Sequence, residues 1–132
     1  MNKGIYTINL VLGHAITVAL VSAILVYGFD YYDKAYGKGI SFQIYLWGTV
    51  LGVIITGVGF SIGVFLSDNI SKYWVGFCIG GLFACAIVIT TYLISLVTYN
   101  TGLKQFLLFT SWFLGSIFTP ILISKIKAYK NG

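Results

Sequence analysis

Residues 42–66 read FQIYLWGTVLGVIITGVGFSIGVFL, without a single charged side chain. A helix of about 20 predominantly apolar residues is long enough to cross a hydrocarbon core about 30 Å thick. Backbone N–H and C=O groups in lipid need partners within their own segment, so this stretch is predicted to be a helix rather than a strand. It therefore indicates a transmembrane helix.

Three further stretches share this character, at about 5–28, 73–97 and 105–123. All eight basic and all three acidic residues lie outside the four stretches, and 58% of the chain is hydrophobic whereas only 8% is charged. A soluble domain normally carries about 25% charged residues. The sequence thus predicts an all-α integral membrane protein, with residues 1–132 forming one membrane domain of four transmembrane helices.

The connections between the stretches are short, which predicts antiparallel neighbours in an up-down-up-down bundle. The positive-inside rule gives the orientation. One side would hold Lys3, Lys72, Lys125, Lys127 and Lys130, and the other would hold Lys34, Lys38 and Lys104. Both termini are therefore expected in the cytoplasm. The chain has no Arg or Glu and is rich in Ile, Tyr and Phe, which is typical of an AT-rich coding sequence from a bacterium or a mobile element. The expected location is a bacterial inner (plasma) membrane.

Small residues recur at helical spacing in three of the stretches. They are Gly48, Gly52, Thr56, Gly59 and Gly63 in the second, Gly76, Gly80 and Ala84 in the third, and Ser111, Gly115 and Thr119 in the fourth. Small residues let helix backbones approach closely in lipid, where no hydrophobic effect drives helices together. We expect these residues to pack helices, and the second and third helices to pack tightly against each other. The alternative is that the glycines line a pathway or permit sliding.

Pro120 lies inside the fourth stretch. It has no N–H for the Ser116 carbonyl, and its ring clashes with that carbonyl. A kink near 116–120 is predicted.

His14, the only histidine of the chain, lies well inside the first stretch, with Asn9 and Thr17 on a polar stripe beside it. An ionisable residue at membrane depth is by default a candidate functional residue, and protonation near neutral pH would suit a switch or relay. The alternative is a neutral imidazole bonded to a Thr, Ser or Tyr of another helix.

Nothing in the sequence points to catalysis. The stretches contain no carboxylate pair, no nucleophile beside a base and no cluster of metal ligands, so we expect no enzyme, metal or cofactor. Cys78 and Cys85 are seven residues apart on one helix, about 10 Å, which is too far for a mutual disulfide. They are interpreted as small apolar residues, with lipidation or an intersubunit bridge as alternatives. The net charge of +5 comes from lysines that flank the stretches, which indicates membrane lipids as partners rather than nucleic acid.

In outline the chain resembles the GtrA-type membrane proteins, which are proposed to move polyprenol-linked sugars across bacterial membranes. The resemblance covers the layout of four spans, the segment LGHAIT at 12–17 and the segment ISKIKAY at 123–129. The aromatic-basic signature usual after the second span of that family is missing, since SDNISKYW at 67–74 contains no Arg. The resemblance implies a role in translocating a lipid-linked substrate.

Three functions fit these features. The first is a non-enzymatic component of transport or translocation of a lipid-linked or small polar substrate. The second is an interaction or immunity protein that binds a membrane protein partner in the bilayer. The third is a holin-like pore formed by a homo-oligomer.

Overall fold

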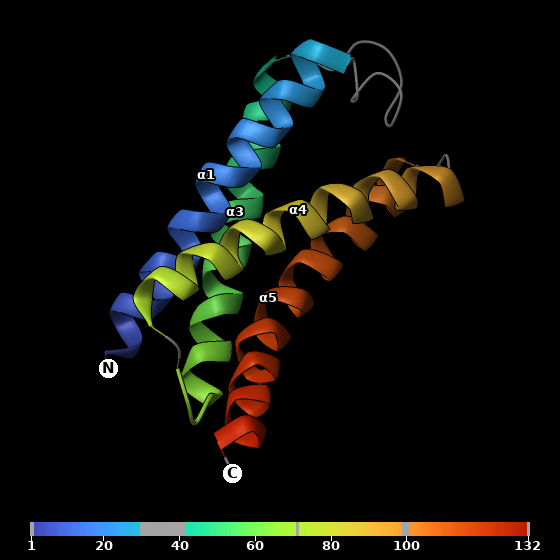
Figure 1. The fold of residues 1–132 in the computed structure, drawn as a ribbon. Coiled ribbons are helices and arrows are strands. Elements are labelled where there is room, and N and C mark those ends of the chain that lie inside the picture. The colour runs from blue at the N-terminus through green and yellow to red at the C-terminus, as the bar shows by residue number, and fades with distance from the viewer. Residues whose placement is uncertain (1, 30–41, 71, 99–100, 132) are drawn as a thin grey trace.

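The chain folds into four long α-helices in the computed structural model, which describes residues 2–29, 42–70, 72–98 and 101–131. Their bounds are α1 Lys3–Phe29, α3 Phe42–Leu66, α4 Tyr73–Val97 and α5 Thr101–Asn131 (Figure 1). Each contains a segment long and apolar enough to cross a membrane. The prediction of an all-α chain with four apolar helices is confirmed, and the four candidate spans indicate an integral membrane protein.

The last helix is longer at both ends than the apolar stretch predicts. α5 begins at Thr101 and runs to Asn131, whereas the apolar stretch covers only residues 105–123. Apolarity marks the part of a helix that lies in lipid, not the end of the helix. Lysine and alanine, which follow residue 123, are good helix formers, so the helix continues past the apolar part.

The four helices form a ring in the order α1, α4, α5, α3. The closest approaches are α1 against α4 and α3 against α5, whereas α1 with α3 and α4 with α5 are looser. The expectation that the second and third helices pack tightly against each other is wrong, because α3 and α4 lie diagonally across the ring and, among the described residues, meet mainly through side chains. The positions of the glycines explain this pairing of the helices.

Glycines of α1 and α4 face the backbone of the opposite helix. A methyl group on Gly80 would clash with the Leu10 carbonyl, and one on Gly13 would clash with the Phe77 carbonyl. Gly76 lies against the Tyr6 ring, with its missing Cβ position 2.8 Å from the ring edge. The small residues predicted to pack the third apolar stretch, 73–97, therefore contact α1.

The predicted stripe of α3 faces α5 instead. A side chain on Gly52 would clash with the Trp112 indole, one on Gly59 with the Ser116 hydroxyl, and one on Gly63 with the Ile117 carbonyl. Small residues thus allow close approach between helices that are not consecutive in the chain, and the two helix pairs α1–α4 and α3–α5 form around them.

The remaining predicted packing residues have varied positions. Thr56 and Ala84 are buried, Gly115 lies beside the Phe83 ring, Ser111 and Thr119 are half-buried, and a methyl group on Gly48 would meet nothing within 4 Å. The buried face of α5 is shifted by one residue from the predicted stripe, since Trp112, Ser116 and Pro120 are buried whereas Ser111, Gly115 and Thr119 are half-buried. Large residues of α5 pack against glycines of α3 at this interface, Trp112 against Gly52 and Pro120 against Gly63.

Pro120 is buried inside α5. Its ring lies 3.0 Å from the position that a Cβ of Gly63 would occupy, so Gly63 provides the space that the ring needs. α5 is curved along its length in Figure 1. The predicted kink at 116–120 stays a prediction.

Both chain ends and the connection between α3 and α4 lie at one end of the bundle (Figure 1). Lys3 donates to the carbonyls of Phe65 and Ser67 at 3.3 and 2.7 Å. Lys127 donates to the Ile70 carbonyl at 2.7 Å, and the backbone N–H of Asn69 donates to the Ser124 hydroxyl at 2.9 Å. These bonds tie α1 and α5 to the segment that follows α3. Toward the opposite end, α1 and α3 stay side by side and diverge from α4 and α5, which also stay side by side (Figure 1).

Candidate functional site

His14 lies at the centre of the ring and is fully buried. The indole N–H of Trp112 donates to its Nε2 at 2.9 Å. The bond spans the ring diagonally, because His14 belongs to α1 and Trp112 to α5. A histidine at this depth is costly without a polar partner, and the indole of another helix supplies one.

Aromatic rings enclose the imidazole on its other sides. The rings of Phe60 and Phe83 lie with centroids 6.1 and 5.4 Å from that of His14, and these two phenylalanines contact each other edge to face at 5.3 Å. Phe60 comes from α3 and Phe83 from α4. The four helices therefore each contribute one ring to the centre of the bundle.

The direction of the Trp112 bond fixes the protonation pattern of His14. Nε2 accepts, so in the neutral ring the proton sits on Nδ1. Nδ1 is buried and has no hydrogen-bond partner among the described residues. The imidazole is thus bonded at one nitrogen only, and a buried donor without a partner costs about 1–3 kcal/mol.

The two polar residues predicted beside His14 do not join it. The Asn9 amide donates to the Ile5 carbonyl of its own helix at 2.9 Å. Thr17 faces α4, with its hydroxyl 3.0 Å from the position that a Cβ of Gly81 would occupy. Asn9, His14 and Thr17, which the sequence predicts to form one polar site, therefore each have a different neighbour and do not form that site together.

Hydroxyl groups within the helices are likewise bonded locally. Thr56, Thr90, Thr91 and Thr119 each donate to the carbonyl four residues earlier, at 2.7–2.9 Å. Side chains bonded in this way do not need water or a polar ligand. These four hydroxyl groups are therefore satisfied within their own helices.

A surface groove runs between α1 and α3, with a volume of about 430 Å³. It is lined by Thr7, Ile8, Val11, Leu12, Ile54, Gly57, Val58 and Ser61. Its two hydroxyls are bonded to carbonyls of their own helices, Thr7 to Lys3 and Ser61 to Gly57. Four of its apolar residues are about half exposed or more. The groove is thus an apolar recess on the outer surface of the helix bundle.

Glycine 57 gives the groove part of its depth. A Cβ at this position would meet only the Val11 side chain, at 3.9 Å, so the close packing within the bundle does not require a glycine here. A larger side chain at Gly57 would fill the groove without displacing a helix.

The features of this site were only partly accessible to sequence reasoning. The sequence marks His14 by its type and its position within an apolar stretch, but it does not indicate the partner Trp112 or the enclosing Phe60 and Phe83. One signal was available: tryptophan prefers the membrane interface, and Trp112 lies in the middle of an apolar stretch. A tryptophan at that depth needs an acceptor for its N–H.

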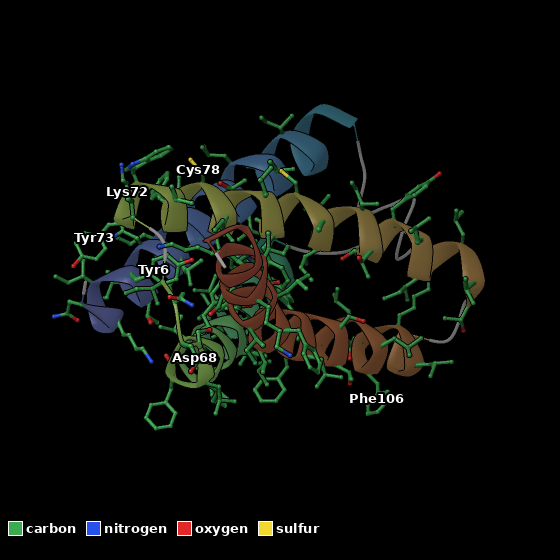
Figure 2. All side chains as sticks on the ribbon, turned by 60° about the horizontal axis from the view of Figure 1, so that its bottom comes forward. Tyr6, Asp68, Lys72, Tyr73, Cys78 and Phe106 are labelled. Atoms are coloured by element: carbon green, nitrogen blue, oxygen red, sulfur yellow. The ribbon has the colours of Figure 1, made fainter. Side chains whose placement is uncertain are left out.

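No site for a metal ion is apparent in the described ranges, where no three His, Cys, Asp or Glu side chains lie together. Cys78 and Cys85 are exposed on the outer face of α4, where Figure 2 labels Cys78. No family model, no curated protein and no solved structure matches this chain.

Proposed function

We propose that this protein is a non-enzymatic component of transport that binds a lipid-linked substrate from within the bilayer and helps to move it across. The observation that carries the proposal is the apolar groove of about 430 Å³ between α1 and α3. Ligand sites typically have volumes of about 300–1,000 Å³ and are mostly apolar. A groove of this size on a membrane-facing surface suits the hydrocarbon part of such a substrate.

The lipid-linked class is favoured over a free polar solute by the state of the polar groups. His14 is sealed by aromatic rings, and the span hydroxyls are bonded to their own helices. A polar solute would need groups along its route that can replace its water. A substrate whose chain stays in lipid needs no such route through the bundle.

The test is translocation in reconstituted vesicles. The protein is inserted into vesicles that carry a phospholipid or a polyprenyl phosphate with a fluorescent headgroup, and a quencher that cannot cross the bilayer is added outside. We expect faster loss of the inner-leaflet signal than in empty vesicles. Gly57→Leu should slow the transfer, because the added side chain fills the groove.

Gly48→Leu is the matched control, since it places the same side chain on the same helix where a Cβ meets nothing within 4 Å. It should leave the transfer unchanged. Transfer no faster than in empty vesicles, for both labelled lipids, would refute the proposal. Equal transfer by wild type and Gly57→Leu would show that the groove is not the route.

A second candidate is an interaction or immunity protein that binds a partner helix in the same groove. Gly57 and Ser61 are four residues apart on α3, and both line the groove. Such small residues commonly accept a second helix in lipid. Photocrosslinking from Val58 in cells would then capture a membrane protein, and Gly57→Leu would abolish that adduct.

We also propose an up-down-up-down arrangement in a bacterial inner membrane, with both termini in the cytoplasm. The lysine distribution supports this orientation, as does the position of both chain ends at one end of the bundle (Figure 1). Labelling of single cysteines introduced near Lys3 and Lys38, with a reagent that cannot cross membranes, tests it: only the second should react in intact cells.

A further inference from the structure

The end of the bundle that carries the chain termini concentrates positive charge. Lys3, Lys72, Lys125 and Lys127 all lie there, and Asp68 is the acidic residue that the structure describes at this end. Figure 2 shows Asp68, Lys72 and Tyr73 at this end and Phe106 far from it. Toward the opposite end, Lys104 is the described lysine, and it is buried.

The four lysines divide into two kinds. Lys3 and Lys127 donate to the backbone carbonyls of Phe65, Ser67 and Ile70, so their ammonium groups hold the bundle end together. Lys72 and Lys125 are exposed, and neither ammonium group donates to another described residue. None of the four forms an ion pair with a carboxylate of the described part. Within the described residues, these four lysines outnumber the single acidic residue at this end, Asp68, and none is paired with it.

These groups lie beside the ends of the candidate membrane spans. The apolar segment of α3 ends at Leu66 and that of α4 begins at Tyr73, so Lys72 directly adjoins the end of a span. Trp74, which follows two residues later, is 66% exposed. Tryptophan and lysine at the end of a span are the usual pair that contacts headgroups.

We propose that this end is a binding surface for the phosphate groups of anionic lipids, with Lys72 and Lys125 as the residues that contact them. Juxtamembrane basic residues contribute about 1 kcal/mol each to binding an anionic lipid surface. Each of the two lysines is therefore expected to contribute about fivefold in affinity. The surface is separate from the α1–α3 groove, and this proposal does not depend on the proposed transport function.

Native mass spectrometry of the full chain in detergent tests it. Phosphatidylglycerol and phosphatidylcholine with identical acyl chains are added in turn, and bound lipid is counted at low and high salt. We expect phosphatidylglycerol to bind more tightly, and the difference to shrink as salt rises. In Lys72→Gln/Lys125→Gln the preference should fall by more than tenfold.

Lys34→Gln/Lys38→Gln is the control, because it removes the same charge from the connection between α1 and α3, outside the described residues. It should keep the preference. Equal binding of the two lipids by wild type would overturn the proposal, as would equal losses in both double variants. Displacement of bound phosphatidylglycerol by free glycerol phosphate would also overturn it, since the surface would then recognise a soluble phosphate.

Discussion

The indole nitrogen of Trp112 lies 2.9 Å from Nε2 of His14 and joins α5 to α1 across the centre of the helix ring. α1 packs closely against α4, and α5 against α3, so this bond connects the two helix pairs. Gly52 makes it possible, because any side chain on Gly52 would occupy the space of the indole. One glycine, one tryptophan and one histidine from three helices thus form a single unit.

Trp112→Phe should destabilise the bundle by about 1–3 kcal/mol, since it leaves the buried imidazole of His14 without any hydrogen-bond partner. Thermal unfolding in detergent measures the effect. Trp74→Phe is the control, because Trp74 is 66% exposed and loses little packing. Equal unfolding temperatures for the two variants would show that the His14–Trp112 bond contributes nothing to stability.

The double variant His14→Leu/Trp112→Phe should be at least as stable as Trp112→Phe alone. Replacing both partners of a buried hydrogen bond by apolar groups can be nearly neutral, whereas removing one leaves a polar atom unsatisfied. A double-mutant cycle with His14→Leu isolates the coupling between the two residues. Strictly additive effects would mean that the two side chains act independently.

Gly63→Ala and Gly80→Ala should each destabilise the protein by about 1–3 kcal/mol, because overpacking forces the backbone to shift. The added methyl groups would meet the carbonyls of Ile117 and Leu10, which are backbone atoms and cannot rotate away. Gly48→Ala is the matched comparison. Nothing lies within 4 Å of its Cβ position, so the better helix propensity of alanine should make it neutral or stabilising by up to about 1 kcal/mol.

Unfolding temperatures of these three alanine variants, measured side by side, check the assignment of buried and open glycines. If Gly48→Ala were as damaging as Gly63→Ala, the face of α3 that contacts α5 would be assigned incorrectly.

The sequence predicted the helices well and their neighbours poorly. The bounds of α3 and α4 follow from the apolar runs alone. Asp68 and Lys72 mark the end of one run and the start of the next, and polar or glycine-containing segments flank the two outer bounds. The pairing of helices depends on which glycine meets which backbone, and this is a property of two helices at once. Gly52 and Gly80 carry no mark in the sequence that assigns one to α5 and the other to α1.

The centre of the bundle shows the same limit. His14 is conspicuous because it is the one histidine in an apolar chain. Its acceptor role became clear only with Trp112 in place, 98 residues further along. A hydrogen bond between distant residues of two helices cannot be derived from the periodicity of either.

The pairing of α1 with α4 predicts a disulfide. The Cβ of Thr17 lies 3.9 Å from the position that a Cβ of Gly81 would occupy, within the 3.5–4.5 Å typical of disulfides. In a Cys78→Ser/Cys85→Ser background, Thr17→Cys/Gly81→Cys should therefore oxidise readily to an intramolecular disulfide. Mass spectrometry after alkylation of free thiols measures the yield.

Gly57→Cys/Gly81→Cys in the same background tests whether α3 packs directly against α4, which is the arrangement that the structure contradicts. Gly57 faces Val11 and Gly81 faces Thr17, so both point toward α1 from helices that lie on a diagonal of the ring. This pair should remain reduced under the same oxidant. A high disulfide yield from Gly57→Cys/Gly81→Cys together with none from Thr17→Cys/Gly81→Cys would mean that α3 and α4 are neighbours after all, and that the ring order α1, α4, α5, α3 is wrong.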